Sequence, residues 1–134
     1  MELDPVFLTI DEVLFIHEDQ LARFGGDSGV RDHGLLRSAL AQPEAFFGGQ
    51  WLHDDLWTMA AAYTFHLVKN HPFVDGNKRI GTVCALHFLA LNGQRVVALN
   101  EQYRDLILAI AEGRAGKDDL AVFLRTHAQP LPGR

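Results

Sequence analysis

Two long apolar segments joined by a short polar run constrain the fold of this chain more than any other feature. The residues from Asp55 to Asn70 and from Asn77 to Leu91 carry apolar side chains around most of a helical circumference. A helix that is apolar nearly all round is a buried one, because its surface has no polar face for water. The sequence therefore predicts two central helices, with residues 71–79 as the loop that joins them.

Capping signals place four further helices around this central pair. A side-chain oxygen that accepts a backbone N–H begins a helix, and glycine or proline commonly ends one. Such signals delimit segments from Thr9 to Gly25, from Asp32 to Pro43, from Asn100 to Gly113 and from Asp118 through Leu124. Together with the central pair they predict an all-α fold of about six helices.

The remaining segments are expected to be short connections. Residues 42–50 are predicted to form a loop or a strand-like flap, and the adjacent Phe46 and Phe47 indicate that this segment packs on something. Residues 94–99 are predicted to be extended, and the tail 128–134 to be frayed. No repeat or linker divides the chain, so we expect a single domain over 1–134 with its core over about 7–127.

Composition narrows the class of protein. With 48% apolar and 22% charged residues the chain resembles an ordinary globular domain. It contains no run of 18 apolar residues and opens with acidic residues, so neither a membrane helix nor a secretory signal is expected. The single cysteine, Cys84, excludes an internal disulfide and favours the cytoplasm. A net charge of −5 argues against direct binding to nucleic acid.

The chemistry is concentrated in residues 71–79, His-Pro-Phe-Val-Asp-Gly-Asn-Lys-Arg. Gly76 and Asn77 permit a tight turn into the second central helix, whose first N–H groups form a potential anion site. Lys78 and Arg79 add two cations there. Cations at a helix N-terminus oppose the helix dipole, so they indicate a bound anion rather than helix stability.

Two further side chains of the run complete the set of groups that phosphoryl or nucleotidyl transfer needs. Asp75 offers a hard oxygen ligand for Mg²⁺ that bridges phosphates. His71 ends the preceding helix and can act as a general base near neutral pH. A polar turn between two helices would explain each residue separately, but it leaves the paired cations unexplained.

The run resembles the active-site motif of the Fic/Doc family, His-Pro-Phe-x-(Asp/Glu)-Gly-Asn-(Gly/Lys)-Arg, and is most similar to that of the Doc (death-on-curing) toxins. The likeness extends over roughly residues 7–127. It includes Arg-Phe-Gly-Gly at the end of the first helix, Gly34-Leu35-Leu36-x-Ser38-Ala39, the Phe-Gly-Gly of the expected flap, and Phe88-Leu89-x-Leu91-Asn92-Gly93.

The resemblance implies an all-helical fold with a small flap over a bound nucleotide, and ATP and Mg²⁺ as substrate and cofactor. It implies that His71 deprotonates the target hydroxyl, that Asp75 binds Mg²⁺, and that Phe73 points into the core and fixes the loop. The segment of Gly76 and Asn77, with Lys78 and Arg79, would hold the ATP phosphates. For Phe46 and Phe47 we expect one to anchor the flap and the other to line the nucleotide or target groove.

Two departures from the usual Fic pattern bear on the reaction. Lys78 stands where AMP-transferring Fic proteins have glycine, and Thr82 stands where they often have a second arginine. The resemblance to Doc toxins therefore favours transfer of the γ-phosphoryl of ATP to a threonine of elongation factor Tu. AMP transfer to a protein hydroxyl and a catalytically silent helical binding module remain the alternatives.

The inhibitory pattern (Ser/Thr)-x-x-x-Glu-(Gly/Asn) of many Fic proteins does not occur, which favours a cognate antitoxin whose helical segment lies in a groove of this protein.

Most of the seven histidines are interpreted as surface or satisfied core residues, and no Cys/His cluster predicts a metal centre. His66 is a candidate for supporting the site.

Overall fold

Six helices and four short strands follow one another in the computed structural model, which describes residues 3–97 and 100–132. The helices are α1 (Ile10–Phe24), α2 (His33–Ala41), α3 (Leu56–Asn70), α4 (Asn77–Leu91), α5 (Glu101–Ala111) and α6 (Lys117–His127). The strands are β1 (Phe46–Phe47), β2 (Gln50–Trp51), β3 (Gln94–Val96) and β4 (Ala128–Pro130). The prediction of an all-α fold with about six helices is confirmed.

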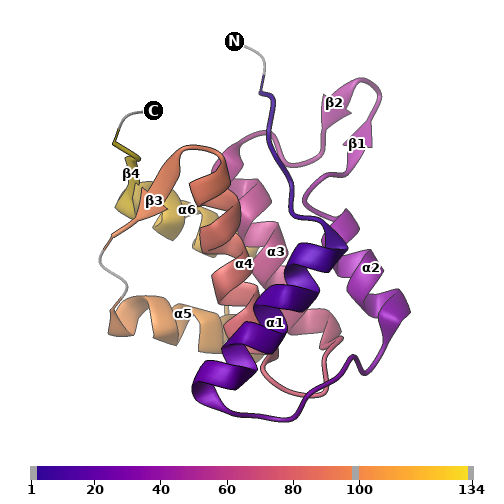
Figure 1. Cartoon of the computed structure of the whole chain (residues 1–134). Helices are drawn as coiled ribbons and strands as arrows, with labels where there is room; N and C mark the ends of the chain where they lie inside the picture. The colour runs from indigo at the N-terminus through magenta and orange to yellow at the C-terminus, as the bar shows by residue number, and fades with distance from the viewer. Residues whose placement is uncertain (1–2, 98–99, 133–134) are drawn as a thin grey trace.

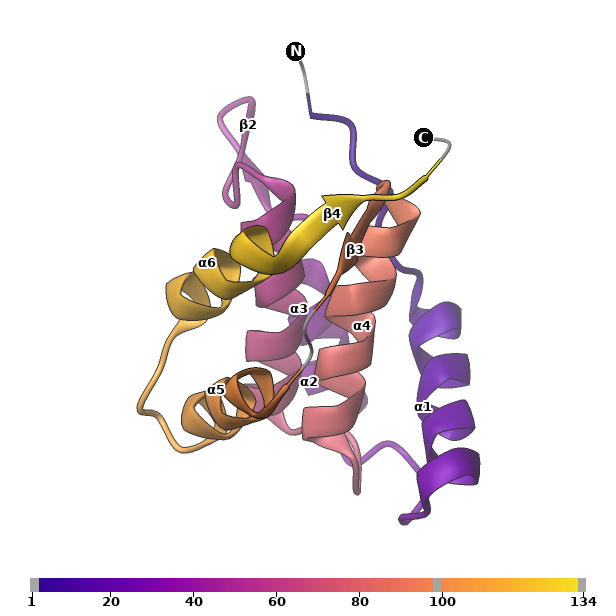
Figure 2. The ribbon, with the colours of Figure 1, turned by 90° about the vertical axis from the view of Figure 1, so that its left-hand side faces the viewer.

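The two apolar helices, α3 and α4, form the centre of the molecule, as predicted. Figures 1 and 2 show α1 on one side of this pair and α5 and α6 on the other. Within α3 the run from Met59 to Thr64 is fully buried, and α4 buries Ile80, Cys84 and Phe88. None of the helices in the described part of the chain has the length and low charge needed to cross a bilayer.

The central helices approach each other closely at Gly81. The Thr64 hydroxyl on α3 donates a hydrogen bond of 2.7 Å to the Gly81 carbonyl on α4. A Cβ atom at position 81 would lie only 3.2 Å from the Thr64 carbonyl oxygen. The absence of a side chain at this position therefore sets how close α3 and α4 can come.

The helix ends follow the capping signals of the sequence. Thr9 and Glu12 form the predicted capping box, with reciprocal hydrogen bonds of 3.1 and 2.9 Å. Asp32, Asp55 and Asn100 each accept backbone N–H groups at the start of α2, α3 and α5. The last helix begins slightly earlier than expected, at Lys117.

The C-terminal tail is ordered where the sequence predicted fraying. Strand β4 pairs antiparallel with β3, Gln94 lying opposite Pro130 and Val96 opposite Ala128 (Figure 2). The Leu131 N–H extends this contact by donating to the Gly93 carbonyl at 2.9 Å. The prediction of fraying is therefore wrong for residues 128–131, because their backbone groups find partners on β3. Residues 98–99 and 133–134 lie outside the described residues.

Candidate active site

The loop between α3 and α4 lines a pocket of about 370 Å³. Six of the side chains or backbone positions selected from the sequence lie in its wall: His71, Asp75, Gly76, Asn77, Lys78 and Arg79. Val68 of α3 and Ala111 of α5 complete the lining. The structure thus brings the candidate base, the carboxylate and the two cations to one cavity at the N-terminus of α4.

Asn77 and Phe73 fix the shape of this loop. The Asn77 side chain accepts a hydrogen bond from the Phe73 N–H and donates one to the Phe73 carbonyl, both at 3.0 Å. Phe73 is fully buried, and Asn77 is 4% exposed. Because both polar atoms of the Asn77 amide are used inside the loop, what this residue offers a phosphate is its backbone N–H.

The start of α4 forms an anion cradle. Gly76 has φ 78° and ψ 21°, and this left-handed turn lets the chain enter α4 without a side-chain cap. The first N–H groups of the helix lack intrahelical acceptors and point toward its N-terminal end. Arg79 is held beside them, since its Nη1 donates to the Gly25 carbonyl at 3.2 Å and its guanidinium lies 5.2 Å from the centre of the Phe24 ring.

Asp75 is an exposed carboxylate held in place by two backbone donors. Its Oδ2 accepts from the Asp27 N–H at 3.1 Å and its Oδ1 from the Gly76 N–H at 2.8 Å. The Asp27 and Gly76 N–H groups lower the pKa of the Asp75 carboxyl below its usual value, so the group is ionised at neutral pH.

The residues at this carboxylate fit Mg²⁺. Each Asp75 oxygen keeps lone-pair capacity for a cation, and Mg²⁺ is commonly bound through one or two carboxylates together with phosphates and water. In the described residues no three His, Cys, Asp or Glu side chains converge into a metal site. A Mg²⁺ ion at Asp75 would therefore take its other ligands from phosphates and water.

The segment from Gly25 to Asp32 covers the motif loop. The Val74 N–H donates to the Gly29 carbonyl at 3.0 Å, and Val30 forms a β-bridge with Phe73. Gly26 approaches Asp75 so closely that a Cβ atom at position 26 would lie 2.9 Å from Asp75 Oδ2. This glycine-rich segment thus lies beside the site.

The predicted flap forms as the hairpin of β1 and β2, but it does not cover the motif, so the expectation that Phe46 or Phe47 lines the nucleotide site is wrong for the motif pocket. Their hairpin precedes the N-terminus of α3, whereas the motif follows the C-terminus of this 15-residue helix, roughly 22 Å away along its axis (Figure 1). Phe46 packs edge-on against Trp51, with ring centres 4.9 Å apart, and Phe47 is 68% exposed. Neither lines the motif pocket.

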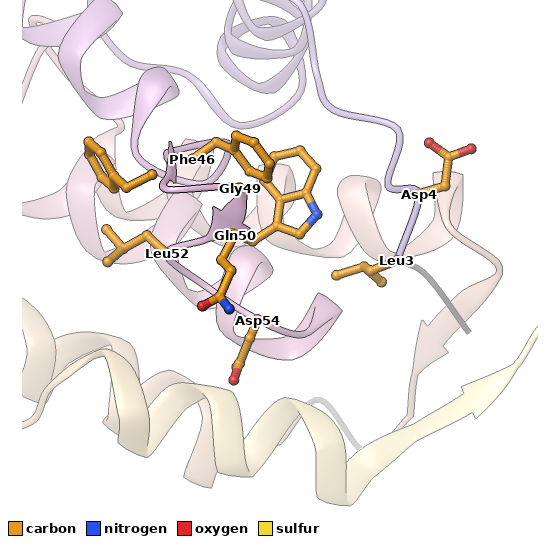
Figure 3. Close-up of a pocket in the computed structure, with 9 residues that line it drawn as sticks. Leu3, Asp4, Phe46, Gly49, Gln50, Leu52 and Asp54 are labelled. Carbon is orange, nitrogen blue, oxygen red and sulfur yellow. The ribbon is translucent and has the colours of Figure 1, made fainter.

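The hairpin borders a larger hollow of its own, of about 1000 Å³. Figure 3 shows Leu3 and Asp4 of the N-terminal segment on one side of it and Phe46, Gln50 and Leu52 on the other. This hollow shares no lining residue with the motif pocket and holds no candidate catalytic group from the motif. We therefore assign the chemistry to the smaller cavity.

His17 of α1 supports the motif loop, which the sequence did not reveal. Its Nε2 lies 2.9 Å from the Asp75 carbonyl oxygen, and its ring stacks on Phe73 with centres 3.8 Å apart. The side chain is only 2% exposed. Asp75 lies 58 positions away along the chain, so no local pattern could have indicated the contact.

His66, the other candidate for a supporting role, lies in a different cluster. Its Nε2 contacts the Lys117 Nζ at 3.1 Å, and the same Nζ lies 3.1 Å from the Nε2 of His53. Burial, followed by the charge of Lys117, lowers the pKa of His66 to about 4. The proposed support of the motif by His66 is wrong, because its polar atom faces α6.

Comparisons with known proteins agree with this site. The model of the Fic/DOC family matches residues 7–89, which include α1 to α3, the motif and most of α4. The Mycolicibacterium smegmatis protein named Toxin Doc is 40% identical over 103 residues, which cover 75% of this chain and 79% of that protein. Protein kinase doc of Escherichia phage P1 is 29% identical over 115 residues, covering 86% of this chain and 90% of that protein. The chain therefore belongs to the Fic/DOC family and is similar to its Doc toxins.

Proposed function

We propose that this protein is a Doc-like toxin that transfers the γ-phosphoryl group of ATP to a threonine hydroxyl of a protein target such as elongation factor Tu. The observation that carries the proposal is the single pocket in which His71, Asp75 and the cationic start of α4 meet. The name of the phage relative, a protein kinase, supports this type of reaction. Blocking translation would follow from the modified target.

The residues divide the reaction among them. A His71 ring nitrogen accepts the proton of the target hydroxyl while its oxygen attacks the γ-phosphorus. The bond between that phosphorus and the oxygen bridging to the β-phosphate breaks, and ADP leaves. The N–H groups at the start of α4, with Lys78 and Arg79, hold the phosphates and stabilise their charge. Such positioning and charge stabilisation make up most of the catalysis of phosphoryl transfer.

Asp75 is the residue that would hold Mg²⁺. A bound Mg²⁺ ion would neutralise part of the phosphate charge. The carboxylate is already ionised and oriented by the Asp27 and Gly76 N–H groups, so little reorganisation is needed to bind a cation.

AMP transfer is the competing reaction within the family. The hydroxyl of Thr82, where a second arginine is frequent in AMP-transferases, donates to the Lys78 carbonyl at 2.9 Å within its own helix. It therefore adds no cation to the cradle, while Lys78 adds bulk and charge on the phosphate path. Both features favour the phosphoryl group as the transferred group. A silent binding module would not need the combination of His71 with an ionised Asp75.

A toxin of this kind requires a partner that restrains it. The chain carries no inhibitory (Ser/Thr)-x-x-x-Glu-(Gly/Asn) pattern, so we propose a cognate antitoxin whose helical segment binds in a groove of this protein. We propose that this activity is cytoplasmic, which a translation factor as target and the single cysteine of the chain would support.

The test is intact-mass spectrometry of elongation factor Tu after incubation with the protein, ATP and Mg²⁺. The expected result is the gain of one phosphoryl group on a threonine. His71→Ala is expected to abolish the gain while the far-ultraviolet circular dichroism stays helical, and chelation of Mg²⁺ is expected to abolish it in the parent. Gain of one AMP would establish the competing reaction, and an active His71→Ala protein would remove His71 as the base.

A further inference from the structure

Arg31 and Asp32 donate hydrogen bonds to the backbone carbonyl groups at, and just after, the C-terminal end of α3. Arg31 Nε donates to the His71 carbonyl at 2.7 Å, and Arg31 Nη2 donates to the Asn70 carbonyl at 3.0 Å. The backbone N–H groups of Arg31 and Asp32 both donate to the Pro72 carbonyl, at 2.7 and 3.0 Å. Three consecutive carbonyls around His71 are thus bound by one short segment.

His71 has a backbone conformation that few side chains adopt. Its φ of 51° and ψ of 53° lie in the left-handed region, and no other residue except glycine has a positive φ in the part of the chain that the structure describes. A Cβ atom makes this region unfavourable, and the proline that follows favours extended backbone at position 71 instead. Such a conformation persists only where the surroundings enforce it.

The Nε and Nη2 donors of Arg31, here called the Arg31 fork, bind the two peptide planes that define this conformation. The Asn70 carbonyl belongs to the plane before the His71 Cα atom, and the His71 carbonyl belongs to the plane after it. Holding both oxygens with one rigid, planar guanidinium fixes φ and ψ at His71 together. The direction of the Cα–Cβ bond follows from φ and ψ, so the fork also sets where the imidazole lies.

We propose that Arg31 is a positioning residue, whose guanidinium holds His71 in the left-handed conformation that places its imidazole in the wall of the motif pocket. This inference rests on the proposed role of His71 as the base. Arg31 itself is exposed and is not among the residues that line the pocket, so it has no contact with the reacting groups. Its effect is transmitted through the backbone of His71.

The consequence is a loss of turnover without a loss of nucleotide binding. Without the fork, His71 is free to relax toward the extended conformations that its proline neighbour favours, and only a fraction of molecules keeps the imidazole at the pocket. We expect Arg31→Met to lower kcat about tenfold, the size of effect that an unfavourable backbone conformation implies. The phosphate-binding groups lie at the start of α4, so KM for ATP is expected to stay within about twofold of the parent value.

The experiment compares Arg31→Met, Arg31→Lys and the control Arg37→Met, an exposed arginine on neighbouring α2, for kcat, KM for ATP and Tm. Lysine keeps the charge but offers a single donor atom, so it is expected to restore only part of kcat. Guanidinium ions at a non-denaturing concentration are expected to raise kcat of Arg31→Met and to leave Arg37→Met unchanged. Arg31→Lys replaces Arg31→Met in all comparisons if the methionine variant does not fold.

A second measurement is independent of activity. The imidazole signals of His71, assigned in ¹³C-labelled protein by comparison with His71→Gln, are expected to shift in Arg31→Met and to stay in place in Arg37→Met. If the parent transfers no phosphoryl group but these signals shift, the proposed reaction fails and the role of Arg31 stands. Unmoved His71 signals, or an unchanged kcat in an active parent, would overturn the role of Arg31.

Discussion

Lys78 is the residue on which the type of reaction depends. It lies in the first turn of α4 and borders both the motif pocket and the neighbouring apolar cleft between α4 and α5. Lys78→Gly removes its charge and bulk together. A charged contact in such a site contributes on the order of 2–3 kcal/mol, so we expect phosphoryl transfer to fall roughly 30–150-fold. The measurement is the rate of phosphoryl gain by mass spectrometry of the target.

A matched variant separates the charge of Lys78 from its bulk. Lys78→Met keeps the length of the side chain and is expected to lose phosphoryl transfer as Lys78→Gly does, without opening space for the AMP-transfer pose. A trace of AMP on the target is therefore expected with Lys78→Gly alone. If Lys78→Gly transfers phosphoryl groups at the parent rate, the reaction type is set by other residues.

His17 is expected to stabilise the motif loop through one hydrogen bond. His17→Leu keeps an apolar contact with Phe73 but leaves the Asp75 carbonyl without its donor. We expect the free energy of unfolding to fall by about 1–2 kcal/mol in urea titrations, with an unchanged m-value. His17→Gln can place an amide N–H near the position of Nε2 and is expected to recover part of the loss. Equal stability of the Leu and Gln variants would show that the hydrogen bond contributes nothing.

At the level of single residues, the sequence could predict what is local and no more. Gly76, Lys78 and Arg79, which form the anion cradle, lie within four positions of one another in the sequence, so their assembly at a helix start could be predicted. The contacts of Arg31 and His17 with the motif join residues 40 and 58 positions apart. An arginine or histidine in those places carries no periodicity or spacing that indicates such a partner.

The helices themselves were largely predictable, because capping residues and apolar periodicity act within a few residues. The short strands were predictable in part. Strands β1, β2 and β3 lie in or beside the segments predicted as a strand-like flap and as extended, whereas β4 lies in the tail predicted to be frayed. Gln129 of the tail lies opposite Arg95, 34 positions away, and Pro130 lies opposite Gln94, and nothing near residue 128 signals these partners. The adjacent Phe46 and Phe47 indicated that their segment packs, and Phe46 does pack on Trp51. The resemblance implied a flap over the nucleotide, but this hairpin precedes α3 and so lies at the end of this helix away from the motif. Gly25 ends α1 as predicted, and Gly26 in addition allows the following segment to lie close to Asp75, which no local pattern indicated.

The packing of α3 on α4 makes a prediction about Gly81. A valine there would bring its side chain against the Thr64 backbone and Val68, which lie 3.2–3.3 Å from an ideal Cβ position. The two central helices would have to move apart, so we expect Gly81→Val to lower the free energy of unfolding by about 2–3 kcal/mol in urea. Ser38→Val, at an exposed position of α2, is the control for the helix propensity of valine. A Gly81→Val protein as stable as this control would contradict the close approach.

Across the whole molecule, one partly buried cluster connects three separate segments. Lys117 at the start of α6 lies between the ring nitrogens of His53, which precedes α3, and His66 on α3. Burial, and then the charge of Lys117, lowers the pKa of both imidazoles, that of His66 to about 4. Both rings are therefore neutral in the folded protein at neutral pH, which lets them accept hydrogen bonds from the ammonium.

This cluster predicts a loss of stability in weak acid. Histidines in the unfolded chain take up protons near pH 6.5, whereas the folded protein resists protonation of His66 down to about pH 4. The unfolded state thus binds more protons in this interval, so the free energy of unfolding falls as the pH falls from about 6.5 to about 4. We expect a loss on the order of 2 kcal/mol, reduced from the full shift because His66 is partly exposed. Asp75 and Glu12, whose pKa values are lowered by backbone N–H groups, act in a separate interval, below about pH 4.5.

Urea unfolding at several values between about pH 7 and about pH 4.5 measures this loss. In the double variant His53→Gln with His66→Gln the slope is expected to be largely removed, because neither side chain titrates, while the stability at neutral pH falls only by the value of two hydrogen bonds. His33→Gln, at an exposed position at the start of α2, is expected to keep the parent slope. A parent protein whose stability is independent of pH over this interval, or a double variant that keeps the full slope, would show that α6 is not held to α3 by neutral histidines.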